Sequence, residues 1–352
     1  MPDIIEIDGS CLEAGGQIVR TAVGLSALTG KRCHIFNIRA GRPKPGLMAQ
    51  HLTSVQAVAQ ICNARVEGAS LWSKELTFVP GKIKSGEFSF DTGTAGAVSL
   101  VLQSLLVPAT AAPGDIAFDV KGGTDVAWSP SMAYFSEILC YWLRKIGIEI
   151  KLEILKYGFY PAGGGRARVA ISAARPSPLV ALERGNPLAI RAISVASERL
   201  RRTNVAERQL AGCKAALSGA THLKVEEELH YVPTLSPGCS MHLFAGFANC
   251  RLGASSIGAR GKPAEQVGRE AAELLLRQIS SGACVDRWAA DQLLPFLAIA
   301  AERGPSKISV AEITNHCLTN IWVIEKFLPV KFEIEGEKGK AGVINCKMKN
   351  RG

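Results

Sequence analysis

Residues 4–28 read IIEIDGSCLEAGGQIVRTAVGLSAL, and they contain a structural unit that the chain goes on to repeat. The β-branched run Ile4–Asp8 predicts a strand, whereas Gly16–Leu28 has apolar residues at spacings of three and four, which predicts a helix. Gly15 and Gly16 lie where the turn meets the helix. The stretch therefore predicts a strand that runs through a glycine-rich turn into an apolar helix.

Sequences of the same kind recur through the first half of the chain. The turn Asp91–Gly96 leads into an expected helix over Ala95–Leu106, and the turn Lys121–Asp125 leads toward another over Met132–Ile146. A further turn, Pro161–Gly165, leads into a strand instead. Because the spacing is irregular, we interpret this as repeated supersecondary units and not as a solenoid. The other elements expected in this half are strands over Arg32–Arg39, Leu76–Val79, Glu87–Phe90, Ile116–Val120, Ile148–Leu155 and Arg166–Ile171, and a helix over Leu47–Cys62.

The pattern changes at the turn Arg184–Pro187, where a different α/β unit begins. Its expected elements are Leu188–Val195, Val205–Leu217, His222–Tyr231, Met241–Ala248 and Ala264–Ile279. The earlier pattern of apolar helices and short strands then resumes. Its expected elements are helix Ala289–Arg303, strand Lys307–Ile313, helix Thr319–Phe327 and hairpin Val330–Met348. We therefore expect a larger α+β domain over residues 1–183 and 281–352, interrupted by a smaller α/β domain over residues 184–280.

The composition is that of a globular protein, with 47% hydrophobic and 20% charged residues among 352. This balance excludes a disordered polymer and a coiled coil. The 41 basic and 31 acidic side chains give a formal net charge of +10. That surplus favours a polyanionic partner without identifying it.

Several features favour a cytoplasmic protein. No run of about 20 apolar residues is free of charges and helix breakers, so no transmembrane helix is expected. The N-terminus lacks the basic and then apolar pattern of a secretory signal. The ten cysteines form no C-x-x-C pair and no zinc-ligand spacing with a histidine, so we expect buried free thiols in a reducing compartment.

Among the six histidines, His316 stands out by its context. A phosphate loop of the type GxxxxGK[ST] is absent, so any nucleotide site has to be of another kind. His316 lies in Ile313–Asn320, between an expected strand and an expected helix, where backbone N–H groups attract anions. A neutral imidazole there is able to attack phosphorus. The same pattern fits a histidine that caps the helix or bonds to its loop, and both interpretations stay open.

Two clusters near the N-terminus are candidate functional residues. Glu13, Gln17 and Arg20 are separated by four and three residues, so they share a helix face if Glu13 belongs to the first turn. The loop 39–46 carries three cations between prolines and glycines, and a stiff loop loses little entropy when it binds phosphate. A surface ion pair would also explain the first cluster, and a solvated loop would explain the second.

Two further segments are candidates for contacts with a nucleobase. In Trp288–Gln292, an aromatic ring precedes a carboxylate and an amide by three and four residues, so it could stack a base and bind its edge. A partly buried helix has the same pattern. Gln103 lies inside the apolar run Val98–Leu106, where its amide needs a partner from either the backbone or a ligand.

Together these segments resemble the RNA 3′-terminal phosphate cyclase family, over nearly the whole chain. Each segment is short, but their order and spacing are specific. The segments that carry the resemblance are 8–20, Arg42–Leu47, Gln50–Leu52, Lys121–Asp125, Gly158–Gly165, Asp291–Leu293 and His316–Asn320.

The resemblance implies an ATP-dependent enzyme of the ligase type that acts on RNA with a 3′-terminal phosphate. With Mg²⁺ or Mn²⁺, the family converts that phosphate to a 2′,3′-cyclic phosphodiester and releases AMP and pyrophosphate. A histidine is first adenylylated, AMP then moves to the RNA 3′-phosphate, and the 2′-OH displaces it. The logic is physical: AMP supplies a leaving group, and the adjacent 2′-OH is already in position.

Site residues follow from the resemblance position by position. It implies that His316 is the nucleophile and that Glu13 helps to hold the metal ion. It assigns nucleotide contacts to Gln103, Arg20 and the segment Trp288, Ala289, Ala290, Asp291 and Gln292. Arg39, Arg42 and Gln50 match positions that are expected to hold a phosphate of ATP or of RNA. We expect these three residues to bind the RNA substrate, although their division between ATP and RNA is open.

Departures from the family pattern leave alternatives. Trp288 stands where the family often has tyrosine. The tryptophan keeps an aromatic ring for stacking but lacks the hydroxyl. Ser131 lies near the position of a nucleotide-contacting glutamine of some relatives.

The main alternative function is that of a catalytically inactive cyclase-like protein of ribosome assembly, but such proteins lack the histidine that His316 matches. An enolpyruvyl transferase built from similar repeats is the second alternative.

The resemblance also implies the fold. The larger domain would hold three repeated units, each a four-stranded sheet with two helices, and the smaller α/β domain would be inserted into it. The oligomeric state, the preferred metal and the biological RNA do not follow from the sequence.

Overall fold

The first structural unit forms as its hydrophobic pattern predicts. The computed structural model describes residues 4–349. Its first unit comprises β1 Ile5–Asp8, α1 Gly16–Thr29, β2 Cys33–Phe36, α2 Ala49–Cys62, β3 Arg65–Glu67 and β4 Leu76–Val79. Buried and less buried residues alternate along β2 and β4, which turn Cys33, Ile35, Leu76 and Phe78 toward the helices. The sheet order is β1-β2-β4-β3, with β1 parallel to β2.

The second and third units have the same strand arrangement as the first. The second comprises β5 Gly86–Asp91, α3 Val98–Ala109, β6 Ile116–Gly122, α4 Met132–Tyr134, η1 Phe135–Leu139, α5 Cys140–Lys145, β7 Ile150–Lys156 and β8 Gly165–Ile171. The third comprises β9 Val180–Ala181, α8 Arg287–Ala300, η3 Ala301–Arg303, β14 Ser306–Val310, α9 Asn315–Phe327, β15 Val330–Glu335 and β16 Gly342–Met348. Their sheet orders, β5-β6-β8-β7 and β9-β14-β16-β15, repeat the first. The expected α+β fold with three repeats is confirmed.

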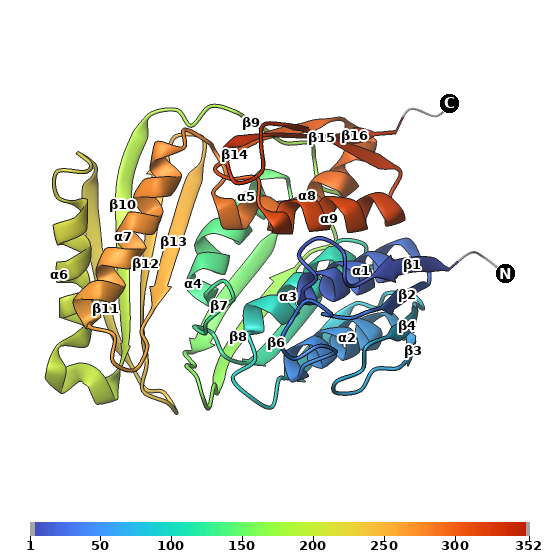
Figure 1. Cartoon of the computed structure of the whole chain (residues 1–352), viewed down its shortest axis with the longest axis horizontal. Coiled ribbons are helices and arrows are strands. Elements are labelled where there is room, and N and C mark those ends of the chain that lie inside the picture. The colour runs from blue at the N-terminus through green and yellow to red at the C-terminus, as the bar shows by residue number, and fades with distance from the viewer. Residues whose placement is uncertain (1–3, 350–352) are drawn as a thin grey trace.

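The remaining four-stranded sheet is formed by the segment between β9 and α8. It comprises β10 Pro187–Ser197, η2 Glu198–Thr203, α6 Val205–Leu217, β11 Lys224–Val232, β12 Cys239–Phe247, β13 Arg251–Ile257 and α7 Ala264–Ser280. Its order is β11-β10-β12-β13, and α6 and α7 pack against each other on it. Figure 1 shows this unit at one end of the molecule. Whether residues 184–280 act as a separate domain stays a prediction.

Helices from the three repeats pack against one another in the interior of the molecule, whereas their sheets lie toward the outside (Figure 1). Helix α1 contacts α2, α3 and α9, and α8 contacts α9. One continuous apolar core joins the repeats, and a second core fills the inserted unit around Leu243 and Leu275. Trp288, at the start of α8, packs against both cores. The first turn of α8 therefore lies close to both the core of the three repeats and the core of the inserted unit.

Several elements differ from the sequence expectations. The short strands β3, β9 and β13 were not expected, because β3 and β9 have only three and two residues and β13 contains glycine and two serines. The helix expected over Met132–Ile146 contains a π-helical segment, η1. Helix α9 begins at Asn315 and not at Thr319, since Thr314 caps it by accepting a hydrogen bond from the Cys317 N–H at 3.1 Å.

The described cysteines are all free, and all except Cys11 are buried. Between residues 4 and 349, no helix combines the length and apolar character that crossing a bilayer requires.

Candidate active site

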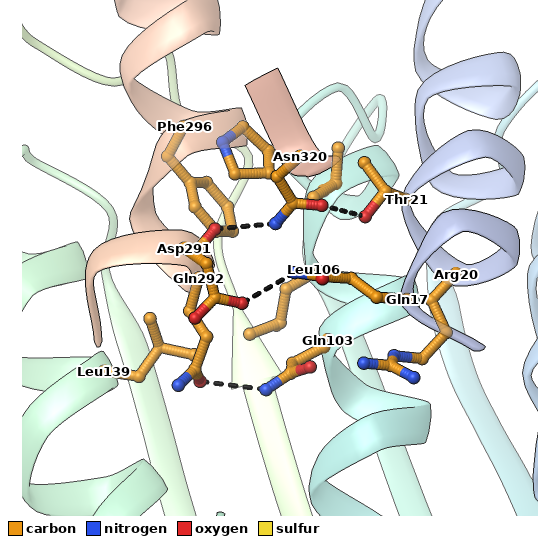
Figure 2. A pocket seen from close by; sticks show the side chains of 12 residues that line it. Gln17, Arg20, Thr21, Gln103, Leu106, Leu139, Asp291, Gln292, Phe296 and Asn320 are labelled. Carbon is orange, nitrogen blue, oxygen red and sulfur yellow. Dashed lines mark hydrogen bonds between the residues drawn. The ribbon is translucent and has the colours of Figure 1, made fainter. Parts of the chain in front are cut away.

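The candidate site lies where the N-terminal ends of α1, α8 and α9 meet beside α3. A cavity of about 30 Å³ opens there. Figure 2 shows amide and carboxylate groups from four helices that point toward one another across it. The polar lining residues are Gln17, Arg20, Thr21, Gln103, Asp291, Gln292 and Asn320. Four of the expected site positions, Arg20, Gln103, Asp291 and Gln292, therefore line one cavity although they are far apart in the sequence.

His316 lies in the first turn of α9 and is held by Gln17. Its Nδ1 is 2.5 Å from Oε1 of Gln17, whose Nε2 donates to Oδ2 of Asp291 at 2.7 Å. The amide oxygen can only accept, so Nδ1 carries the ring proton while Asp291 is ionised. The lone pair of His316 is then on Nε2. This chain of hydrogen bonds gives the imidazole the tautomer of a nucleophile.

The surroundings of His316 favour its neutral form. Partial burial of the ring, together with the positive charges of Arg20, Arg42 and Arg287, lowers its pKa to about 4. The positive end of α9 acts in the same direction. The residue still has an exposed surface. His316 is thus both neutral near pH 7 and accessible from solvent.

Asp291 is fixed by two neighbouring helices. In addition to Gln17, Asn320 of α9 donates Nδ2 to the Asp291 backbone carbonyl at 2.8 Å, and Thr21 of α1 donates its hydroxyl to Asn320 at 2.7 Å. Burial raises the pKa of Asp291 to about 7, although Arg20 opposes this shift. The carboxylate therefore lies near its titration midpoint at neutral pH.

Arg20 is a cation at the edge of the cavity. Burial lowers its pKa to about 10, so it remains charged at neutral pH. Within the described residues its guanidinium forms no hydrogen bond or ion pair, although Asp291 is close enough to raise its pKa. An unpaired guanidinium at the edge of a cavity is suited to bind an anion such as phosphate.

The first turn of α8 is fixed by the buried carboxylate of Asp286. Its Oδ1 accepts from the N–H groups of Trp288 and Ala289 at 3.0 and 2.9 Å, and from the Tyr134 hydroxyl at 2.5 Å. Its Oδ2 accepts from Gly253 N–H in β13 at 3.0 Å. The Tyr134 ring also meets the Trp288 indole edge to face, with centroids 6.3 Å apart. Asp286 thus joins α8 to the second repeat and to the inserted unit.

Two glutamines form the floor of the site. Gln103 of α3 donates Nε2 to Oε1 of Gln292 at 2.9 Å, and Gln292 donates Nε2 to the Trp288 carbonyl at 2.6 Å. The Oε1 of Gln103 stays available to a ligand. Ala289 and Ala290 have fully buried side chains, so any contact they make with a ligand would have to use the backbone. Their assignment to a nucleotide stays a prediction.

Glu13 forms the edge of the site nearest the basic loop. One carboxylate oxygen pairs with Arg42, while the other, Oε2, is buried and has no hydrogen-bond partner. A buried carboxylate oxygen without a partner is suited to a hard cation, and Mg²⁺ often takes only one or two protein carboxylates together with phosphate and water. No cluster of three or more His, Cys, Asp or Glu ligands occurs among residues 4–349. Glu13 therefore fits a metal ion that also binds phosphate.

The other expected phosphate-binding residues lie around the N-terminus of α2. Arg39 donates Nη1 to the carbonyls of Lys44 and Gly46 at 2.8 and 2.7 Å, so it braces its own loop. Gln50 accepts at 3.3 Å from the Ala97 N–H that precedes α3. Arg42 is half-exposed beside Glu13. Of these residues, Arg42 has the most accessible guanidinium.

Some residues of the site carry no assignment from sequence reasoning. Gln17 belonged to the noted triplet but had no role, because nothing in the sequence indicates its contacts with His316 and Asp291. Asp286 could have been found, since an aspartate before an apolar helix is a typical N-cap. Asn320 is at the end of a segment already noted. Tyr134 has no signal that distinguishes it from a core aromatic.

Comparison with known proteins identifies similar sequences over the full length of the fold. The sequence profile of the family described as RNA 3′-terminal phosphate cyclase matches residues 11–334. A protein of Methanopyrus kandleri with that name is 44% identical over 351 residues, which cover 98% of this chain and 99% of the relative. Another with the same name, from Pyrococcus furiosus, is 44% identical over 347 residues, covering 97% and 98%. One from Archaeoglobus fulgidus is 43% identical over 337 residues, covering 95% and 99%.

The pKa of His316 can be measured by NMR titration of the histidine rings. We expect a midpoint near pH 4, because burial and three nearby cations disfavour the imidazolium. The neutral form then persists as the pH falls from about 6.5, where an ordinary histidine is half protonated, to about 4. Arg20→Ala should raise the midpoint. A midpoint at 6 or above in the unsubstituted protein would contradict this description of the site.

Gly16→Ala tests how closely α1 approaches α2. A Cβ at Gly16 would collide with Nε2 of His51. The His51 ring is buried, and its Nδ1 accepts a hydrogen bond from the Met48 N–H at 3.1 Å. We expect a loss of about 1–3 kcal/mol in the free energy of unfolding, because the ring has to move. Gly246→Ala is the matched control, since its Cβ would meet neighbours no closer than 3.7 Å. Equal thermal unfolding midpoints for the two variants would refute the close contact.

Proposed function

Because the chain belongs to the RNA 3′-terminal phosphate cyclase family, we propose that it uses ATP to convert an RNA 3′-terminal phosphate to a 2′,3′-cyclic phosphodiester. We propose His316 as the nucleophile. The observation that carries this assignment is the hydrogen-bonded chain from His316 through Gln17 to Asp291, at the N-terminus of a helix. It leaves Nε2 unprotonated and surrounded by cations that attract phosphate.

In the first step, Nε2 of His316 attacks the α-phosphorus of ATP. A nitrogen–phosphorus bond forms, the bond between the α-phosphorus and the bridging oxygen breaks, and pyrophosphate leaves. Nδ1 keeps its proton, and Gln17 supports the positive charge that develops on the ring by accepting from Nδ1. Positioning and charge neutralisation account for most of the catalysis of such transfers.

In the next two steps, AMP passes through the RNA. An oxygen of the RNA 3′-phosphate attacks the same α-phosphorus, which breaks the nitrogen–phosphorus bond and returns His316 to its neutral form. The adjacent 2′-oxygen then attacks the RNA phosphorus, loses its proton and expels AMP. The 2′-OH needs little further ordering, since it is on the same ribose.

The nucleotide and the RNA would use different parts of the site. We assign the adenine to the Trp288 ring, to the amides of Gln103 and Gln292 and to the carboxylate of Asp291, because stacking and polar hydrogen bonds are typical of base recognition. Arg20 lies beside these groups and would bind phosphates of ATP. We assign Arg39, Arg42 and Gln50, on the adjoining loop and helix, to the RNA 3′-phosphate.

A divalent metal ion fits beside Glu13, where Oε2 has no protein partner. Such an ion would neutralise charge on the phosphates. The contribution of the chain itself is to keep this carboxylate buried, with only 9% of its side chain exposed, and close to Arg42.

A label on the α-phosphate of ATP tests the first step directly. We expect the protein to retain label after denaturing separation when it is incubated with ATP and Mg²⁺. Acid should release the label as AMP, because the nitrogen–phosphorus bond of a phosphoramidate is acid-labile. RNA with a 3′-phosphate should discharge it, while RNA with a 3′-hydroxyl should not. His316→Ala should reduce labelling below detection because Nε2 is absent.

The same experiment separates the alternatives. A folded protein that takes up no label with any of several metals would favour a non-catalytic role in ribosome assembly. Label that persists in His316→Ala would mean that another residue is the nucleophile.

Gln17→Leu tests the hydrogen-bonded chain. The variant keeps much of the side-chain volume but loses both contacts, so His316 loses its fixed tautomer and orientation. We expect the rate of adenylylation to fall on the order of 100-fold. Gln209→Leu is the control, since Gln209 is a fully buried glutamine of α6 in the inserted unit. Equal adenylylation rates for the two variants would exclude a positioning role for Gln17.

A further inference from the structure

Trp128 exposes a large aromatic ring to solvent. The residue is 99% exposed and has a left-handed backbone, with φ of 66°. Its loop is nevertheless held on both sides: Ser129 donates its hydroxyl to the Val126 carbonyl at 3.0 Å, and Ser99 donates to the Pro130 carbonyl at 2.7 Å. A bulky residue in this conformation needs support from its surroundings. The backbone of the loop is therefore held in place, and the loop presents the indole to solvent.

Tyr160 is a second exposed ring on an adjoining loop. It is 75% exposed, in the connection between β7 and β8. The two loops are joined, because Asp125 and Phe159 form a bridge and Thr124 N–H donates to the Gly158 carbonyl at 2.9 Å. Trp128 lies three residues after Asp125, and Tyr160 lies one residue after Phe159. Both rings are therefore close in sequence to the same bridge. Neither ring has a role in the adenylylation described above.

Both loops adjoin the candidate active site. Ser99, which holds the Trp128 loop, is one helical turn before Gln103 on α3. The same loop continues into α4, whose Tyr134 contacts Trp288. On the other side, a Cβ at Gly163 would collide with the backbone at Ala95, and the nearby Ala97 N–H donates to Gln50. A molecule bound in the site could therefore continue onto these rings.

The surface extends from the rings to exposed cations of the inserted unit. Leu235, 53% exposed, lies against Gly164, and Ser236 accepts from the Ala162 N–H at 3.0 Å. Thr234 on the same loop donates to the Ser197 hydroxyl at 2.8 Å. Ser197 precedes η2, which carries Arg199 and Arg202. Both arginines are exposed, and neither has an ion pair within residues 4–349.

We propose that the rings of Trp128 and Tyr160 and the guanidinium groups of Arg199 and Arg202 form a binding surface for single-stranded RNA. It holds the nucleotides that precede the reacting 3′ end, and it rests on the proposed function. Exposed aromatic rings stack on bases that are not paired, and arginines bind the backbone between them. The net charge of +10 favours the same polyanion. We call these four residues the stacking surface.

Single-stranded RNA is favoured over a protein partner by continuity with the site. The Trp128 loop accepts a hydrogen bond from Ser99 of α3, the helix that carries Gln103. The Tyr160 loop lies against Ala95 through Gly163, two residues before the Ala97 N–H that donates to Gln50. A strand whose 3′ end reaches His316 would leave the site past these loops. A protein partner would need no such arrangement.

The test measures binding of 5′-fluorescein oligouridylates with a 3′-phosphate, three or ten nucleotides long, by anisotropy without ATP. We expect the unsubstituted protein to bind the ten-nucleotide probe more tightly than the three-nucleotide probe. Trp128→Leu, which keeps apolar bulk but removes the ring, should weaken binding of the longer probe roughly 5- to 100-fold. Trp128→Phe should retain most of the affinity. Thermal unfolding of each variant establishes that it is folded.

The two arginines are tested by the salt dependence of binding. The double variant Arg199→Gln with Arg202→Gln should lower the slope of log affinity against log salt by about 1.4, at about 0.7 per phosphate contact on a single strand. Lys82→Gln with Lys84→Gln is the charge-matched control. These lysines are exposed, and Lys84 N–H bonds to Ile61 at the end of α2 opposite to Gln50.

The outcomes for the stacking surface and the proposed function are distinguishable. If the wild-type protein is labelled by ATP but binds the longer probe equally well with and without the Trp128 ring, the stacking surface is wrong and the function stands. If the wild type is not labelled while Trp128→Leu still weakens RNA binding, the function fails and the surface stands. A salt slope that is the same in both double variants also overturns the assignment of the arginines.

Discussion

One buried carboxylate, that of Asp286, connects the parts of the molecule on which the site depends. It accepts hydrogen bonds from the Tyr134 hydroxyl of the second repeat, from Gly253 of the inserted unit and from the first turn of α8. Each of these donors would be buried without a partner if the carboxylate were absent, at about 1–3 kcal/mol each. Burial raises the pKa of Asp286, so these bonds are needed to keep it ionised. The direction in which α8 presents Trp288, Asp291 and Gln292 follows from this contact.

Three arginines set the electrostatics around His316. Arg20, Arg42 and Arg287 all disfavour protonation of its imidazole, and two of them also pair with acids, Arg42 with Glu13 and Arg287 with Glu312. A site of this kind attracts phosphate and keeps its imidazole neutral by the same means. The property depends on helices from the first and third repeats, so neither repeat has it alone.

The sequence predicts local features of the fold well and contacts between distant residues poorly. The bounds of α6 and β4 agree with their hydrophobic patterns, and the repeated strand, turn and helix sequences correspond to real units. By contrast, β9 has two residues and depends on pairing with β14, so no local pattern could reveal it. The spacing of Glu13, Gln17 and Arg20 indicates a shared face. That Gln17 contacts His316, 299 residues away, follows only from the packing of α1 on α9.

The inserted unit lies between β9 and α8, and so it divides the third repeat. The partner of β9 is β14, with Val180 opposite Lys307, so this sheet can close only after the whole insertion has left the ribosome. The insertion has its own apolar core. If the insertion folds first, the chain that links β9 to β14 acts as a shorter loop. During synthesis from the N-terminus, two repeats and the insertion are therefore available before α9 emerges. The helix that carries His316 is then among the last to be added, and a chain truncated before it has no imidazole at this site.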